Sequence, residues 1–255
     1  MAKLIQVTNL KKIFENGSET VHAFGPLSVD INIGEFVTIL GPSGCGKSTL
    51  MLIIAGLLES TSGKVEFENK LVEGPKTDIG IMFQNNTLVP WRTVKGNIEL
   101  QLELRKLSLE DYEDKVNDIL KSVNLEDFAH RYPNELSGGM QQRAAFCQAM
   151  IHEPKIILLD EPLGKLDAMT REKIRADFQK LWMIKKPTVI FVTHSIEEAV
   201  QLSSRIILIT PRPGKIDREM KIDLPYPRDL KLKRSAKFME YVNSIEEVFH
   251  EYGVI

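Results

Sequence analysis

Residues 41–48 read "GPSGCGKS" and directly follow the apolar run "EFVTIL" of residues 35–40. The octapeptide matches the phosphate-loop pattern G-x-x-x-x-G-K-[ST] at every defined position. In such a loop, glycines let the backbone turn so that several N–H groups face one phosphate cluster, and the dipole of the following helix adds to that field. The apolar pattern of "KSTLMLIIAGLL" (residues 47–58) predicts this helix. The sequence therefore predicts a strand, a phosphate-binding loop and a buried helix in this order.

The loop and the first turn of its helix supply the candidate phosphate-binding residues. Lys47 is expected to place a cation on the β- and γ-phosphates of a nucleotide, and the Ser48 hydroxyl is a candidate Mg²⁺ ligand. A chance glycine-rich turn is the competing interpretation, but it does not explain the strand before the loop and the helix after it. Cys45 is interpreted as a small filler rather than a reactive thiol. The full set is Gly41, Pro42, Ser43, Gly44, Cys45, Gly46, Lys47, Ser48 and Thr49.

Two carboxylates follow the apolar run in "IILLDEP" (residues 156–162). A strand buried on both faces is expected to end at the ligand crevice of a parallel sheet, where Asp160 can hold Mg²⁺. Glu161 is then the candidate general base for the water that attacks a γ-phosphate. Taken alone, two acids after a strand also describe a solvated strand end, but their order after a phosphate loop favours the site.

Two further strands end in polar side chains. "FVTHS" (residues 191–195) is expected to deliver His194 to the same edge, for a polar contact with the γ-phosphate. Gln84 in "IMFQNN" (residues 81–86) likewise ends a strand and can join water to the metal ion. The competing interpretations are a structural histidine and an exposed glutamine without a role.

Strands and helices alternate along most of the 255 residues, which predicts an α/β fold with a mostly parallel sheet core and an antiparallel β part. The first forty residues read as short strands. We expect a nucleotide-binding domain over residues 1–220, with a helical subdomain at about 93–150. Apolar residues recur at helical spacing from residue 93 to about 131. A C-terminal extension (221–255) is expected to carry an acidic amphipathic helix. The basic segment 211–237 is interpreted as a solvated face, with contact to lipid headgroups as the alternative.

Charge and hydropathy exclude several classes of protein. The net charge of −2 gives no overall field toward nucleic acid or anionic lipid. The longest apolar run, "LMLIIAGLL" (residues 50–58), is far too short to span a membrane. The start of the sequence lacks an apolar stretch with a small-residue cleavage site, so we expect no signal peptide. Cys45 and Cys147 fit no metal-ligand spacing and suit a reducing cytosol.

The segment "LSGGMQQR" (residues 136–143) places Ser-Gly-Gly at a predicted helix start, an arrangement that suits a bound anion. The candidate residues are Ser137, Gly138, Gly139 and Met140. One chain would thus carry two anion sites that are far apart in the sequence.

These motifs, in this order, resemble the ATP-binding subunit of ABC transporters. The resemblance runs from about Leu4 to Gly214: "GPSGCGKST" is similar to the Walker A motif, "FQ" ending at Gln84 to the Q-loop, "LSGGM" to the family signature, "IILLDE" to Walker B and "VTH" to the switch histidine. Within the family, "LVPWRTV", "LSGGMQQR" and "PRPGKI" resemble the importer branch that serves nitrate, sulfonate and taurine-type substrates.

The resemblance implies an ATPase that uses ATP and Mg²⁺ and pairs head to tail with a second copy of itself. Each ATP would lie between the phosphate loop of one subunit and the signature of the other, which explains two anion sites in one chain. The other implied partners are transmembrane permease subunits and, indirectly, a solute-binding protein, with no nucleic acid. The protein would sit peripherally on the cytoplasmic face of the cell inner membrane.

The resemblance also implies roles for single residues. Phe14 falls where an aromatic ring stacks on adenine, although a core phenylalanine is the competing interpretation. Residues 85–92, with Trp91, would form the groove that receives a coupling helix of the permease. Gln142 and Arg143 would support the signature helix.

The sequence departs from the family pattern at two single residues and in one short run. In "GKLD" (residues 164–167), Lys165 replaces the usual alanine before Asp167, which we count with the nucleotide site. Ser195 stands where the family usually has aspartate, and "FCQAM" replaces a more usual Ala-Arg-Ala run. No catalytic group is lost, but Lys165 leaves the tightness of dimer closure open.

Two other classes are weighed against the importer. An ABC ATPase acting on nucleic acid or ribosomes usually carries two cassettes, long coiled-coil inserts or strongly basic arms, which this sequence lacks. A phosphate-loop kinase would have no use for "LSGGM". The solute contacts other subunits, so the sequence leaves it open.

Overall fold

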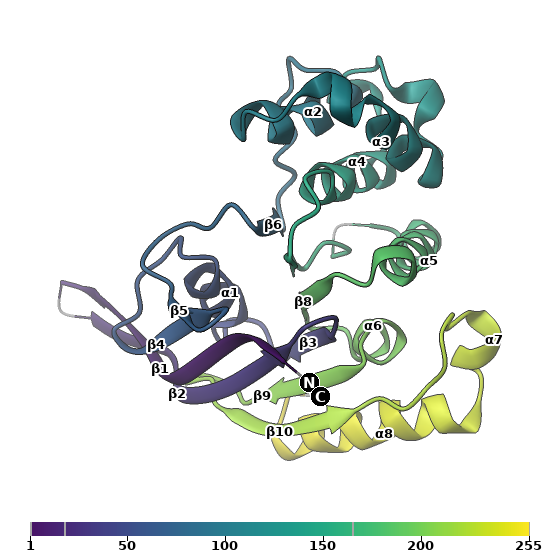
Figure 1. The fold of residues 1–255 in the computed structure, drawn as a ribbon. Helices are drawn as coiled ribbons and strands as arrows, with labels where there is room; N and C mark the ends of the chain where they lie inside the picture. The colour runs from purple at the N-terminus through teal and green to yellow at the C-terminus, as the bar shows by residue number, and fades with distance from the viewer. Residues whose placement is uncertain (1, 18, 165, 255) are drawn as a thin grey trace. The chain divides into compact units, whose positions relative to one another are not determined.

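The computed structural model describes residues 2–17, 19–164 and 166–254 of the chain. Contacts within the chain group into two compact units: residues 1–76 with 188–255 form unit 1, and residues 77–187 form unit 2. Each unit is built of both strands and helices (Figure 1). None of the described helices is both long and apolar enough to cross a membrane.

Unit 1 contains an antiparallel sheet with the strand order β2-β1-β4-β5. Strands β1 (Lys3–Asn16) and β2 (Glu19–Asn32) are followed by β4 (Ser62–Phe67) and β5 (Lys70–Leu71). The prediction of short strands was wrong here, because β1 and β2 are 14 residues each. Their pairing shifts register at four places between Lys3 and Ile13, and these irregularities interrupt the alternation of apolar and polar residues.

A second set of strands in unit 1 carries the phosphate loop. Strand β3 (Phe36–Leu40) pairs in parallel with β8 (Thr188–Thr193) and with β9 (Arg205–Ile209), while β10 (Ile216–Lys221) runs antiparallel to β9. Every residue of β3 and β8 is buried, as expected for parallel strands covered on both faces. Helix α1 (Lys47–Ile54) follows β3 and ends before Gly56, earlier than its apolar pattern indicated. Helix α6 (Ile196–Leu202) follows β8.

The C-terminal segment belongs to unit 1 and contains α7 (Leu230–Lys233) and α8 (Ala236–Glu251), drawn in yellow in Figure 1. The predicted amphipathic helix is confirmed, since α8 buries one apolar face against α6 and the chain after β10. The buried side chains of this face are Phe238, Val242, Ile245, Val248 and Phe249.

The basic segment 211–237 was expected to be solvated, but Arg228 within it is buried, with only 2% of the residue exposed. Its guanidinium lies 4.1 Å above the ring of Tyr226. It donates hydrogen bonds of 2.7–3.3 Å to four backbone carbonyls, those of Val200, Ser203, Ile222 and Leu224. Two of these carbonyls lie at the C-terminal end of α6, where a cation also interacts favourably with the helix dipole. Arg228 thus joins the C-terminal segment to α6.

Unit 2 pairs β6 (Ile79–Met82) in parallel with β7 (Ile156–Asp160) and carries α-helices between and after these strands, with short 3₁₀ turns at Glu126–Phe128 and Pro133–Glu135. The α-helices are α2 (Val94–Leu104), α3 (Leu109–Ser122), α4 (Gly138–Met150) and α5 (Ala168–Lys185). Helix α4 contacts α2, α3 and α5. Helices α2 and α3 lie within residues 93–131, where helical periodicity was read from the sequence, and α4 ends at Met150, where a following helix was expected to end.

We predict that Arg228→Ala lowers the free energy of unfolding by on the order of 3 kcal/mol, because it leaves several buried carbonyls without a donor. Thermal or urea unfolding monitored by circular dichroism measures this loss. Lys231→Ala removes an exposed cation of the same basic segment and is expected to change stability by less than about 0.5 kcal/mol. If the two variants unfold at the same temperature or the same urea concentration, the role of Arg228 is contradicted.

Candidate functional site

The phosphate loop of unit 1 connects the end of β3 to the start of α1. Gly46, the residue before α1, has φ 96° and ψ 11°, in the left-handed region that favours glycine. A Cβ at this position would also lie 3.0 Å from the carbonyl oxygen of Ala23 and from the ring of Phe24. Glycine is therefore required at position 46 by both backbone conformation and space.

Lys47 is the first residue of α1, and its side chain folds back over the loop. Only 5% of it is exposed. Its Nζ donates to the carbonyl oxygens of Gly41 at 2.9 Å and Pro42 at 2.8 Å. The ammonium thus closes the loop from within, while Ser48 and Thr49 continue the first turn of α1, whose N–H groups face the N-terminal end of the helix. The predicted phosphate-binding residues are therefore brought together on one loop and one helix end.

His194 also belongs to unit 1 and directly follows β8, where its side chain is exposed. Its neighbours are held firmly. The buried Thr193 hydroxyl donates to the Glu198 carboxylate at 2.6 Å and accepts from the Ser195 N–H at 3.1 Å. Ser195 in turn caps α6 by accepting from the Glu198 N–H at 3.4 Å. Serine and aspartate are both good N-cap residues, which explains why Ser195 can replace the aspartate usual in the family.

Sequence reasoning missed Thr193 and Glu198, although a signal was present. "SIEE" (residues 195–198) contains the Ser-x-x-Glu spacing of a capping box at a helix start. In the structure Glu198 is turned toward Thr193 and so fixes the turn on which His194 stands.

In unit 2, the ends of β6 and β7 bring together two of the predicted residues. Asp160 ends β7 and is 7% exposed, and Glu161 follows it with a left-handed φ of 42°. Gln84 lies two residues beyond β6, and its Nε2 is 3.3 Å from Oε2 of Glu161. Because β6 and β7 are parallel neighbours, their carboxyl ends meet at one edge, as expected from the sequence. Gln84 is thus no isolated surface glutamine.

The signature segment begins α4 in unit 2. Ser137 is the N-cap residue, and its hydroxyl accepts from the Met140 N–H at 3.3 Å. A Cβ added to Gly139 would lie 2.5 Å from the side chain of Thr170, so glycine permits the close approach of α4 to α5. Gly138 and Gly139 form the first turn of the helix, where backbone N–H groups lack intrahelical partners.

Arg143 and Gln142 are buried on α4, as expected for residues that support the signature helix. The Arg143 guanidinium forms an ion pair of 2.8 Å with Asp177 on α5. Burial raises the pKa of Asp177 despite this cation. The pair joins α4 to α5 inside unit 2, and Asp177 is a further residue that the sequence analysis did not identify.

Asp167 caps α5, because its carboxylate accepts from the N–H groups of Met169 at 3.1 Å and Thr170 at 3.0 Å. Hydrogen bonding, first of all with Thr170, lowers the pKa of Asp167. The neighbouring Lys165 lies outside the described residues.

Phe14 in β1 is 40% exposed, so the interpretation of this residue as a core phenylalanine was wrong. The Nζ of Lys12 lies 4.9 Å from the centre of its ring, close enough for a cation–π interaction. The exposed ring is compatible with stacking on a base.

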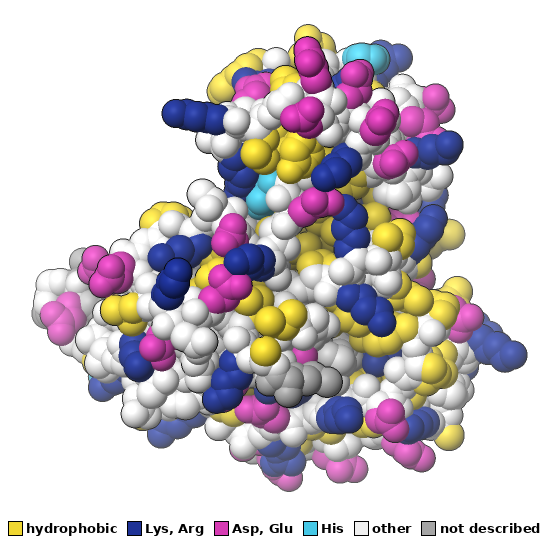
Figure 2. Space-filling model, in the orientation of Figure 1, with side chains coloured by type: hydrophobic (Ala, Val, Ile, Leu, Met, Phe, Trp, Pro, Cys, Tyr) yellow, Lys and Arg dark blue, Asp and Glu magenta, His cyan; other side chains and the backbone are white. Residues whose placement is uncertain are grey.

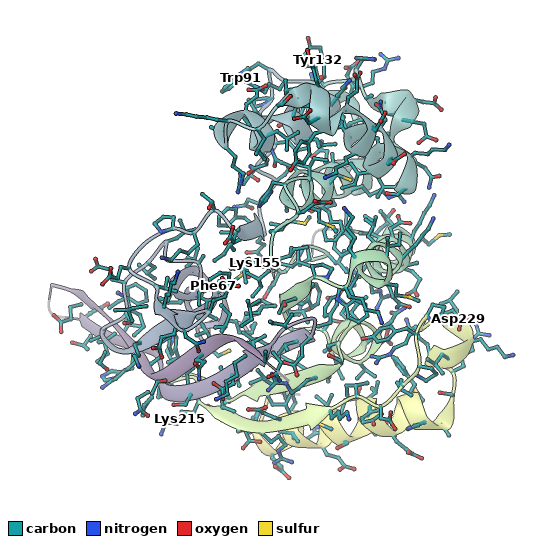
Figure 3. The ribbon with its side chains drawn as sticks, viewed as in Figure 1. Phe67, Trp91, Tyr132, Lys155, Lys215 and Asp229 are labelled. Carbon is teal, nitrogen blue, oxygen red and sulfur yellow. The ribbon has the colours of Figure 1, made fainter. Side chains whose placement is uncertain are left out.

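Trp91 is 77% exposed and forms part of a groove in unit 2. Trp91 and Tyr132 are labelled at the same end of this unit in Figure 3. The groove has a volume of about 870 Å³ and is lined by Pro90, Trp91, Asp127, His130, Arg131, Tyr132, Asn134 and Glu135. Asn97 on α2 fixes the segment next to Trp91, since its buried amide exchanges hydrogen bonds of 2.6 and 3.1 Å with the Val89 backbone.

The oxygen donors expected for Mg²⁺ fit that ion, because hydroxyl, carboxylate and amide oxygens are hard ligands. The donors expected from the sequence are the Ser48 hydroxyl, the Asp160 carboxylate and the Gln84 amide oxygen. Mg²⁺ is typically held by one or two carboxylates together with phosphate oxygens and water. The described residues contain no cluster of three or more His, Cys, Asp or Glu side chains able to hold a metal ion. An ion carried by nucleotide phosphates does not need such a cluster.

The chain matches known proteins over most of its length. A sequence model of the ABC transporter family matches residues 24–164. An ABC transporter ATP-binding protein of Methanocaldococcus jannaschii is 44% identical over 247 residues, covering 97% of this chain and 91% of that protein. An aliphatic sulfonates import ATP-binding protein of Bacillus cereus is 39% identical over 251 residues, covering 98% of both chains.

A solved structure extends the comparison to the fold. It is a dimeric ATP-binding cassette in a post-hydrolysis state, bound to ADP and Pi. The TM-score is 0.76 at 36% sequence identity, covering 87% of this chain and 100% of that one. The chain therefore belongs to the ABC transporter family, and it is an ATPase of that family. The α/β fold predicted from the sequence is confirmed.

Proposed function

We propose that this chain binds ATP and Mg²⁺ between two copies of itself and couples ATP hydrolysis to the uptake of a small solute through a separate permease. The observation that carries the proposal is the contact of Gln84 with Glu161 in unit 2, at 3.3 Å. It joins the residue proposed to link water to the metal ion with the residue proposed to polarise the attacking water.

Each predicted residue receives a role in hydrolysis. Backbone N–H groups of residues 43–49 and the ammonium of Lys47 hold the phosphates, and Phe14 stacks on adenine. Glu161 accepts a proton from the attacking water, which Gln84 orients, and His194 donates a hydrogen bond to the γ-phosphate. Ser48, Gln84 and Asp160 would hold Mg²⁺, which would supply positive charge to offset that of the phosphates.

The second anion site is proposed to act on the ATP of the partner subunit. Ser137, Gly138, Gly139 and Met140 present the N-terminal end of α4, which favours a negatively charged group. The dimeric state of the solved relative supports a paired arrangement. Asp167, counted with the nucleotide site from the sequence, is proposed to belong to this composite site.

The proposed transport role rests on the relatives and on the Trp91 groove. Bacillus relatives named as aliphatic sulfonates import ATP-binding proteins support an importer of nitrate, sulfonate, taurine-type or similar solutes. An exposed tryptophan beside Tyr132 offers an apolar anchor for a helix of the permease. Through it, the protein would attach peripherally to the cytoplasmic face of the inner membrane and act with a solute-binding protein.

Charge on the surface supports transport over action on nucleic acid. Figure 2 shows acidic side chains scattered among the basic ones on the visible face of unit 1. The net charge of −2 agrees with this mixture. A nucleic-acid-binding ATPase would be expected to present a continuous basic stripe.

We predict that Glu161→Gln keeps ATP affinity but slows turnover by about 10²–10⁴-fold, because it removes the general base. ATP should then hold two copies together, which gel filtration with ATP and Mg²⁺ measures. Glu110→Gln, on the exposed face of α3, serves as the control and should turn over normally. Near-normal turnover of Glu161→Gln, or a monomer in the presence of ATP, would refute the role of Glu161.

We predict that Trp91→Ala retains ATP binding but loses membrane recovery and transport when it is expressed with its permease. Ile184→Ala removes an exposed apolar side chain outside the groove and should leave both unchanged. Binding of the purified wild-type chain to protein-free liposomes at physiological salt would argue against attachment through a permease.

We predict complementation between a Lys47→Ala variant and a Ser137→Arg variant. Each composite site consists of one phosphate loop and one signature. In a homodimer of either variant, one of these two motifs is disabled in both sites. In a mixed dimer both faults fall in one site, and the other site pairs an intact Lys47 with an intact Ser137. Trapped nucleotide should rise from near zero to at most one per mixed dimer. No recovery in dimers shown to be mixed would mean that the signature does not act on the partner's ATP.

A further inference from the structure

The loop between β9 and β10 lies against the outer side of the phosphate loop, within unit 1. The Gly214 N–H donates to the Ala23 carbonyl at 3.1 Å, and the Gly214 carbonyl accepts from the Gly25 N–H at 2.7 Å. A Cβ on Gly214 would lie only 2.2 Å from the carbonyl oxygen of Cys45. The "PRPG" segment (residues 211–214) is therefore packed directly onto the loop that begins at Gly41.

Arg212 makes the polar contact between these two loops. Its Nε donates to the carbonyl oxygen of Gly44 at 3.2 Å. A Cβ on Gly44 would lie 3.8 Å from its Nη2, so the guanidinium lies against the tip of the phosphate loop. Within the described part of the chain, the Arg212 side chain has no ion pair with a carboxylate, so its positive charge adds to the field at this loop.

The carbonyl that Arg212 contacts belongs to the peptide group between Gly44 and Cys45. In a trans peptide the C=O and N–H bonds point in opposite directions. A cation on the carbonyl side therefore fixes the orientation of this group and directs the Cys45 N–H away from Arg212. It also polarises the peptide group, because hydrogen bonds to a charged donor are stronger than neutral ones.

We propose that Arg212 is a positioning residue for phosphate binding, which acts through the Gly44–Cys45 peptide group and raises the affinity of the loop for polyphosphates. The inference rests on the proposed function, since it assumes that residues 41–49 bind nucleotide phosphates. It differs from the role of Lys47, because Arg212 acts from outside the loop and is exposed to solvent.

The test uses the full chain and three ligands: ATP, ADP and inorganic tripolyphosphate, with affinities measured by calorimetry. Arg212→Met keeps the length of the side chain and removes its charge and its donors. Loss of an exposed charge-assisted hydrogen bond should weaken binding of all three ligands by about 3- to 10-fold. Arg212→Lys retains a cation that can reach the carbonyl. Its change in log Kd should therefore be at most half of the change seen for Arg212→Met.

In steady-state hydrolysis, the KM for ATP should rise for Arg212→Met while kcat stays within about twofold, since uniform binding is lost and not transition-state stabilisation. Lys215→Met removes a cation three residues away, at an exposed position before β10 (Figure 3), and should leave all affinities unchanged. Thermal unfolding without ligand checks that each variant is folded.

The outcomes separate the inference from the proposed function. Unchanged affinity for all three ligands in Arg212→Met would overturn the inference. Weaker binding of ATP with unchanged binding of tripolyphosphate would overturn it as well. Lys47→Ala is measured in parallel. If it loses nucleotide while Arg212→Met binds normally, the proposed function stands and only the role of Arg212 fails. If the wild-type chain itself binds neither ATP nor tripolyphosphate, the proposed function fails as well.

Discussion

The left-handed turn at Gly46 is the constraint on which the phosphate loop depends. It lets the chain leave β3, reverse direction and enter α1 within six residues, so that loop and helix N–H groups converge. Lys47 then stabilises the turn by bonding two carbonyls of the loop, and Arg212 bonds a third from the other side. A loop that gathers N–H groups toward a ligand leaves some of its carbonyls in need of donors, and the two cations supply these donors, Lys47 from within the loop and Arg212 from outside it.

In unit 2, the backbone likewise determines where the site residues lie, because the ends of two strands position their side chains. Parallel pairing of β6 and β7 brings Gln84 to Glu161, while a left-handed backbone at Glu161 turns the chain sharply just after Asp160. A non-glycine residue in that conformation costs on the order of 1 kcal/mol or more, and such outliers gather at functional sites. The cost is tolerated because the flanking strand is buried and rigid.

The site was more predictable from sequence than the fold around it. Walker-type motifs encode local geometry, so "GPSGCGKS" sufficed to place Lys47 at the start of a helix, and "IILLDE" sufficed to place Asp160 and Glu161 at the end of a strand. The 14-residue hairpin of β1 and β2 was not predictable in length, because its register shifts disrupt the alternation of side chains. Arg228 was read as solvated, since its acceptors Val200 and Ser203 are more than twenty positions away in the sequence. Contacts of that kind leave no local pattern.

The burial of Arg228 and α8 also bears on how the chain can be shortened. The end of the sequence looks dispensable, because it follows the last motif that carries chemistry. A truncation after β10 would nevertheless remove Phe238, Val242 and Ile245 from their partners Val200, Ile206 and Leu208 and leave this apolar surface open to water. Such a protein would be prone to aggregate and to be degraded in the cell. Affinity tags and fluorescent fusions are therefore better appended beyond Tyr252 than substituted for the C-terminal helix.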